Sequence, residues 1–176
     1  YDLFIMDSDG GPAEQITHHS SGDRITDWSS DGKKLLFHSA RNARMRPGIY
    51  EISTKGGLAK PVFDGEFAHS GSYSPDGGKV ILNLGNFRWT RKAYKGSGDV
   101  DLWVFDKDLG SFERLTNTDT NDGWPMWSRD EDVVYFISER NGTRNLFEMS
   151  VKSKKAKQLT KHEDDGVLFP LSLIHI

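Results

Sequence analysis

Short apolar runs flanked by polar residues recur along the whole chain, in the pattern typical of β-strands. The runs at 34–38, 80–82 and 133–137 are rich in β-branched and aromatic residues. Each is shorter than the roughly 10 residues of an amphipathic helix, and its composition favours a strand. Asp-Gly and Gly-Gly pairs, which supply the positive φ of tight hairpin turns, separate such runs at 31–32, 56–57 and 76–77. The pattern predicts an all-β protein built from antiparallel hairpins.

Three sequence markers repeat along the chain with one common period. An aromatic residue, a serine and an acidic turn recur with serine spacings of 45 and 54, at Ser29, Ser74 and Ser128. A marker at the end of a later strand steps by 45, 54 and 44, at Thr17, Val62, Thr116 and Thr160. An apolar strand core steps by 46, 53 and 44, from Leu3 to Ile49, Leu102 and Leu146. A period of about 44 residues is typical of one propeller blade, so we expect a partial β-propeller of four-stranded antiparallel blades.

One incomplete propeller is therefore expected over residues 1–172. The repeat divides it into three full blades and a partial unit at each end, in the order 1–17, 18–62, 63–116, 117–160 and 161–172. Propellers close with roughly four to eight blades, so apolar blade faces would stay uncovered at both ends. We predict that this stretch is not an autonomous domain and, because it starts in mid-strand without Met, that sequence precedes it.

Residues 173–176 do not fit the repeat. Continuing the register places Ser172 opposite Ser128, so the sequence Leu-Ile-His then stands where an acidic turn is expected. We interpret 173–176 as a tail of foreign or misread sequence, with one degenerate blade as the alternative.

Composition and charge narrow the range of partners. Lys and Arg number 23 and Asp and Glu 26, giving a formal net charge of −3, and the chain has no cysteine. No basic field would attract nucleic acid or an anionic membrane, and no apolar run approaches the roughly 18 residues of a membrane helix. We therefore expect no nucleic-acid partner and no membrane insertion.

Catalytic and metal-binding motifs are not found. Residues 71–75 do not form the Gly-x-Ser-x-Gly of a nucleophile elbow, and the repeated serines are expected to make turn hydrogen bonds. His38, His69 and the other histidines do not have zinc-site spacing. Residues 7–11 lack the downstream Glu of a calcium loop and are interpreted as a hairpin turn, and 119–123 as a solvated loop. We expect no catalytic residue, no metal and no cofactor in this segment.

The blade at 63–116 is longer than its neighbours, and the excess lies between its second and third strands, within 86–98. This loop, expected on the same rim as the inter-blade connections, mixes cations with aromatic rings, a combination suited to carboxylates and peptides. The candidate residues for peptide or partner contact are Arg88, Trp89, Arg91, Lys92 and Tyr94. The alternative, which we favour, is that the aromatics pack on the adjacent blade while the cations are solvated or paired with nearby acids.

Two arginines stand at matching positions of different blades, Arg41 and Arg140. A repeated arginine is typical of architecture rather than of a site. We expect each to brace its loop by donating hydrogen bonds to carbonyls or to a neighbouring carboxylate.

The blade sequences resemble those of a known propeller family. Units ending in Trp-Ser-x-Asp-Gly, then an apolar strand and Ser-x-Arg-x-Gly-x-x-x-Leu-Phe, are similar to the blades of the TolB propeller and its relatives. More narrowly, the order of 73–77, 87–96, 101–106, 124–127 and 134–142 resembles the six-bladed N-terminal propeller of tricorn proteases and tricorn-like serine peptidases. The resemblance covers nearly all of 1–172, with departures at Ala93, Asp130-Glu131 and Glu139.

This resemblance implies a non-catalytic propeller that gates or filters peptides for a C-terminal serine peptidase region not present in this chain. The implied partners are peptides or unfolded protein, the remaining blades and the protease region of the same chain, and other copies if a homo-oligomer forms. The family favours the cytoplasm, with the periplasm as the alternative. Two further hypotheses stay open, a TolB-like interaction propeller without enzymatic activity and the propeller lid of a prolyl-oligopeptidase-like hydrolase.

Overall fold

The computed structural model describes residues 1–86, 90, 95–96 and 98–170. Within them it has a two-stranded sheet, β1 (Phe4–Ile5) and β2 (Glu14–Gln15), followed by three four-stranded sheets. The second sheet consists of β3 (Asp23–Trp28), β4 (Lys34–Ser39), β5 (Gly48–Ser53) and β6 (Lys60–Pro61). The third consists of β7 (Ala68–Tyr73), β8 (Lys79–Leu84), β9 (Asp101–Asp106) and β10 (Ser111–Arg114). The fourth consists of β11 (Asp122–Trp127), β12 (Val133–Ser138), β13 (Asn145–Ser150) and β14 (Ala156–Gln158).

Within each sheet, consecutive strands pair antiparallel, so each four-stranded sheet is a simple meander. The predicted all-β fold with four-stranded antiparallel sheets is thereby confirmed. No helix long and apolar enough to cross a bilayer occurs among the described residues.

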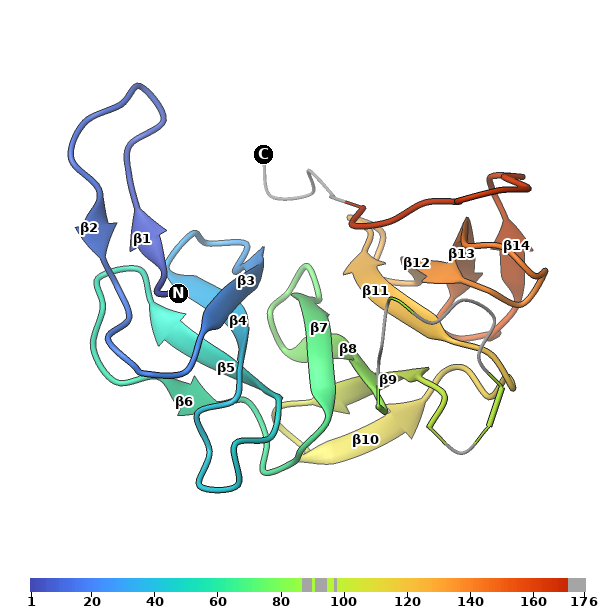
Figure 1. Cartoon of the computed structure of the whole chain (residues 1–176), viewed down its shortest axis with the longest axis horizontal. Helices are drawn as coiled ribbons and strands as arrows, with labels where there is room; N and C mark the ends of the chain where they lie inside the picture. The colour runs from blue at the N-terminus through green and yellow to red at the C-terminus, as the bar shows by residue number, and fades with distance from the viewer. Residues whose placement is uncertain (87–89, 91–94, 97, 171–176) are drawn as a thin grey trace.

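The sheets stand side by side along an arc, as Figure 1 shows. β3, β7 and β11 line the inner side of the arc, and β6, β10 and β14 lie on its outer side. The inner strands of neighbouring sheets contact one another. This is the radial stacking of propeller blades, in which the first strand of each blade faces the common axis.

Apolar residues between neighbouring sheets form the core. Trp127 of β11 packs against Ile81 and Val104 of the sheet before it and Phe136 of its own. Tyr73 of β7 occupies the corresponding place one sheet earlier. Since each sheet hides one apolar face against the next, the hydrophobic effect holds the blades in their radial order.

The first-strand aromatics differ in burial, although their sequence positions match. Tyr73 is 1% and Trp127 2% exposed, whereas Trp28 is 39% exposed. Trp127 is covered from the preceding sheet by residues of β8 and β9. The sheet before Trp28 contains only β1 and β2, which match β9 and β10 in the repeat, so the described residues provide no counterpart of β8 there. Burial of this aromatic therefore depends on the neighbouring blade.

The repeated serines make turn hydrogen bonds, as expected. Ser74 Oγ accepts from the Lys79 backbone N–H at 2.8 Å and donates to Asp76 Oδ1 at 2.5 Å. Ser29 makes the same pair of bonds in the earlier blade. The Ser74 bond is the largest of several causes that lower the pKa of Asp76. The strand-one serine is thus part of the hairpin and not a free nucleophile.

Arg41 and Arg140 brace their loops through carboxylates, as the sequence predicted. Arg41 donates to Asp23 at 2.5 Å, and Arg140 donates to both carboxylate oxygens of Asp122 at 3.1 and 3.2 Å. The Arg140 guanidinium also lies 5.2 Å from the Phe136 ring centroid. Each arginine thus joins the loop after the second strand to a buried carboxylate on the first strand of the same sheet.

Candidate functional site

The five residues predicted to contact a peptide or partner, Arg88, Trp89, Arg91, Lys92 and Tyr94, lie outside the described residues. Lys95 from the same loop is described, and its Nζ lies 3.4 Å from Asp119 Oδ2, both side chains being largely exposed. Asp119 belongs to the connection between the third and fourth sheets, so Lys95 stands on the rim where the inter-blade connections run. The contact role of the other five residues stays a prediction.

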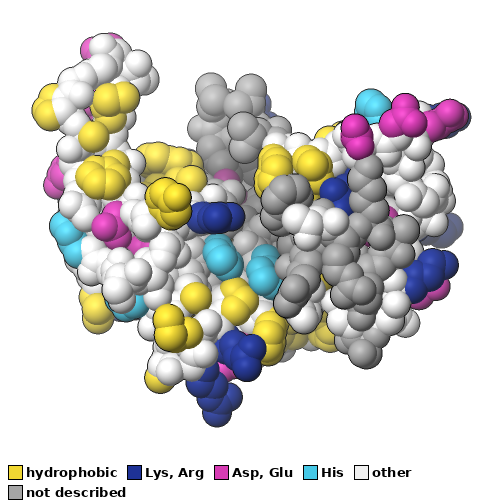
Figure 2. Space-filling view, viewed as in Figure 1, with side chains coloured by type: hydrophobic (Ala, Val, Ile, Leu, Met, Phe, Trp, Pro, Cys, Tyr) yellow, Lys and Arg dark blue, Asp and Glu magenta, His cyan; other side chains and the backbone are white. Residues whose placement is uncertain are grey.

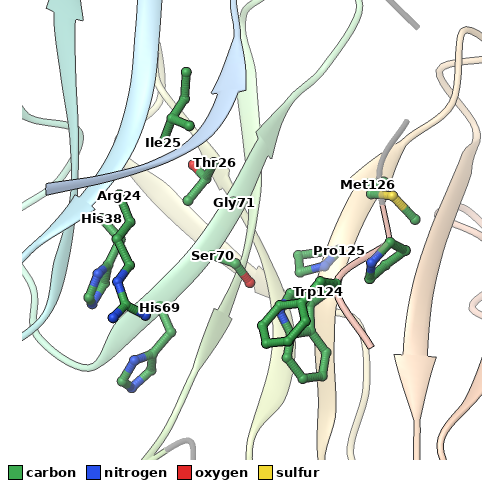
Figure 3. A pocket seen from close by; sticks show the side chains of 12 residues that line it. Arg24, Ile25, Thr26, His38, His69, Ser70, Gly71, Trp124, Pro125 and Met126 are labelled. Atoms are coloured by element: carbon green, nitrogen blue, oxygen red, sulfur yellow. The ribbon is translucent and has the colours of Figure 1, made fainter. Parts of the chain in front are cut away.

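A cavity of about 450 Å³ opens on the inner side of the arc, among β3, β7 and β11. Figure 3 shows Arg24, His38 and His69 gathered on one side of it, and Trp124 and Pro125 on the other. In the space-filling view of Figure 2, histidine side chains lie in the hollow at the middle of the face. Three blades therefore contribute side chains to one concave surface next to the propeller axis.

The inner strands are irregular where they line this cavity. The pairing register shifts between Ile25 and Asp27 in β3, between Ala68 and Gly71 in β7, and between Gly123 and Met126 in β11. Bulges interrupt the row of N–H and C=O groups that an edge strand offers to another chain. The inner edge is thus poorly suited to adding a strand, and side chains are the groups that can recognise a ligand here.

Two histidines from different blades meet in the cavity wall. The rings of His38 and His69 stack with centroids 5.6 Å apart and an interplanar angle of 21°. His69 Nε2 lies 3.1 Å from the Gly85 carbonyl oxygen, whereas His38 Nε2 is buried without a hydrogen-bond partner. Burial lowers the pKa of both rings, that of His38 to about 4 with further contributions from His69 and Arg24. Both rings are therefore uncharged at neutral pH.

This histidine pair was not predicted from the sequence, because His38 and His69 do not have the spacing of a zinc site. The available signal was their place in the repeat, since one lies near the end of a second strand and the other near the start of the next first strand. Among the described residues, no group of three or more His, Cys, Asp or Glu side chains gathers to hold a metal ion.

Ser70, between the two walls, is held by its own blade. Its hydroxyl and its backbone N–H both donate to Asn83 Oδ1, the latter at 2.8 Å. The hydroxyl is thus committed to an amide oxygen and is not activated by an imidazole as a nucleophile would be.

Titration of His38 predicts a measurable loss of stability in acid. The folded pKa of His38, about 4, lies below the usual value of about 6.5, so stability present above about pH 6.5 is lost as the pH falls to about 4. Burial is the largest cause of this lowered pKa; His69 and Arg24 lower it further, and Asp23 raises it. We expect this one group to cost on the order of 2–3 kcal/mol over that range, and His38→Phe to flatten the curve. Urea unfolding at several pH values measures it, and identical curves for both proteins would contradict the prediction.

Comparison with known proteins supports the resemblance seen in the sequence. The model of the tricorn protease N-terminal beta propeller domain matches residues 1–172. A tricorn protease homolog from Saccharolobus solfataricus is 34% identical over 165 residues, 93% of this chain but only 15% of that relative. The crystal structure of TolB from Acinetobacter baumannii superposes with a TM-score of 0.77 at 20% identity, over 94% of this chain and 39% of TolB.

A third similar protein is a puromycin-hydrolyzing peptidase from Mycobacterium tuberculosis. Its structure superposes with a TM-score of 0.66 at 18% identity, over 92% of this chain and 27% of the peptidase. Identities this low show the fold alone, and the fold that they share is the β-propeller, of which this chain forms a part.

Proposed function

Because this chain belongs to the family of tricorn protease N-terminal β-propeller domains, we propose that it is a non-catalytic gate. In this proposal, peptides or unfolded segments pass along its inner side towards a serine peptidase region elsewhere in the same protein. The chain spans 15% of the length of its Saccharolobus solfataricus relative, so the chemistry is assigned to the remaining part.

The observation that carries the proposal is the inner cavity. It lies where β3, β7 and β11 face the propeller axis, and a channel along that axis selects extended chains by its width. Its walls offer both polar and apolar side chains, which suits peptides of mixed composition. The engagement of Ser70 with Asn83 agrees with a role in passage rather than in bond cleavage.

Narrowing the channel tests the gate. In the full-length protein, Met126→Trp enlarges a side chain that lines the cavity. We expect kcat/KM for a long unfolded polypeptide such as reduced casein to fall about three- to ten-fold, or ~1 kcal/mol at the barrier, while a short chromogenic peptide is cleaved as before. Leu109→Trp is the matched control, because Leu109 is 77% exposed on the turn between β9 and β10.

Equal effects on long and short substrates would contradict the gate. A full-length protein that cleaves neither substrate would favour the TolB-like interaction propeller. If a nucleophile-elbow serine outside this chain carries the cleavage, the hydrolase-lid hypothesis takes the place of the tricorn arrangement.

A further inference from the structure

The side chains that line the inner cavity differ in chemistry from one wall to the other. We propose that it binds peptide segments in which an acidic side chain stands next to an aromatic or aliphatic one. This inference rests on the proposed gate and deepens it, since it names the class of peptide that the channel retains.

One wall of the cavity supplies an uncompensated cation. Arg24 lines the cavity and is exposed, and no ion pair joins it to any residue that the structure describes. Oδ2 of the neighbouring Asp23 carboxylate is bound by Arg41 at 2.5 Å, and no Asp or Glu is among the described residues that line the cavity. A free guanidinium in a concave site is suited to a carboxylate, which it can bind through two parallel hydrogen bonds.

The same wall supplies polar groups whose bonding capacity is unused. Thr26 Oγ1 and His38 Nε2 are both buried and have no hydrogen-bond partner among the described residues, and both residues line the cavity. Buried polar atoms are nearly always hydrogen-bonded in proteins. A peptide backbone or carboxylate placed beside Arg24 would offer them partners.

The opposite wall is apolar and presents aromatic rings. The rings of Trp124 and Phe169 meet edge to face with centroids 5.3 Å apart and an interplanar angle of 74°, and Phe169 is still 59% exposed. Pro125 and Met126 extend this surface. An aromatic or aliphatic side chain that packs here removes apolar area from water on both partners.

The size of the cavity fits a short segment and not a folded partner. Its volume of about 450 Å³ lies in the lower part of the range of small-ligand sites, roughly 300–1,000 Å³. A carboxylate bound at Arg24 and a ring bound at Trp124 would have to come from nearby side chains of one peptide, because both walls belong to this one cavity.

A double-mutant cycle between peptide and protein tests the inference. Fluorescent peptides with acetylated and amidated ends carry a Glu-Phe, Gln-Phe or Glu-Ala core, so that no terminal charge contributes. Binding to the full-length protein is followed by anisotropy after treatment with a serine-reactive fluorophosphonate, with peptide integrity checked by mass spectrometry. We expect the Gln-Phe peptide to bind about five- to ten-fold more weakly than Glu-Phe, and Arg24→Gln to abolish that difference.

Two further variants separate the walls. Trp124→Leu is expected to reduce the preference for Phe over Ala while leaving the preference for Glu over Gln. Arg44→Gln is the matched control for charge, since Arg44 pairs with Glu66 and its side chain is 79% exposed, and it should bind all peptides as the unchanged protein does. Equal binding of the Glu and Gln peptides, or a preference that survives in Arg24→Gln, would overturn the inference.

The two proposals can fail separately. Selective peptide binding by a full-length protein that cleaves no polypeptide would support the cavity and overturn the gate. A length-dependent effect of Met126→Trp without any Glu or Phe preference would support the gate and overturn the cavity's selectivity.

Discussion

Replacing Trp127 by Ala is expected to lower the free energy of unfolding by about 3–5 kcal/mol. The side chain is 2% exposed and packs among Ile81, Val104 and Phe136 between two sheets, and its Nε1–H donates to the Glu131 carbonyl oxygen at 3.0 Å. The truncation therefore leaves a cavity at a blade interface and an unpaired carbonyl. Urea denaturation followed by fluorescence measures the loss.

Two further substitutions serve as comparisons for Trp127→Ala. Trp127→Phe keeps most of the buried area and loses the hydrogen bond, so we expect an intermediate loss. Leu109→Ala removes a side chain that is 77% exposed and should change stability by less than about 0.5 kcal/mol. A loss below about 1 kcal/mol for Trp127→Ala would mean that this aromatic does not hold the blades together.

Removing Arg140 is expected to be as damaging, again by about 3–5 kcal/mol, because it leaves a buried charge without its partner. The Asp122 side chain is fully buried, and burial raises its pKa even with Arg140 in place. A group with a raised folded pKa penalises the fold at pH values above that pKa, and the penalty disappears below the unfolded value of about 4. The loss in Arg140→Ala should therefore be smaller near pH 4 than near neutrality, and equal losses would contradict this account.

The third sheet has no ion pair at the positions that Asp122 and Arg140 occupy in the fourth sheet. At the positions of Asp122, Ser138 and Arg140 it carries Ala68, Leu84 and Asn86. The triple variant Asp122→Ala, Ser138→Leu, Arg140→Asn introduces these three uncharged residues at the matching positions of the fourth sheet. Replacing a buried ion pair as a set is often close to neutral, so we expect most of the stability lost in Arg140→Ala to return. A triple variant no more stable than Arg140→Ala would show that the pair has a further role in that blade.

Local patterns in the sequence determined the blade itself. The period near 44 residues and the short β-rich runs predicted four-stranded antiparallel sheets, because one meander closes within one repeat. The serine turns and the role of Arg41 and Arg140 followed from residues that recur at fixed offsets, since equivalent positions have equivalent surroundings. The predicted rim loop with Arg88 and Tyr94 is a different case, because it departs from the repeat and lies outside the described residues.

The structural role of the threonines in the second repeated marker is seen only in the tertiary structure. Thr116 Oγ1 accepts the backbone N–H of Leu102 at 2.9 Å and donates to Asp101 Oδ1 at 3.0 Å. Thr17 and Thr160 accept the corresponding N–H groups of their own sheets. The repeat period located these threonines, but only the structure shows that their hydroxyls join the end of the fourth strand to the third strand by hydrogen bonds.

Contacts between non-equivalent positions were decided by the tertiary structure alone. A repeat states which residues superpose from blade to blade, but it does not state which residues of different strands face each other across the axis or across a blade interface. The stacking of His38 on His69, the position of Arg24 opposite Trp124 and the exposure of Trp28 all depend on how neighbouring sheets are placed beside one another. The sequence by itself therefore determined the blade, and the packing of blades around an axis determined the cavity.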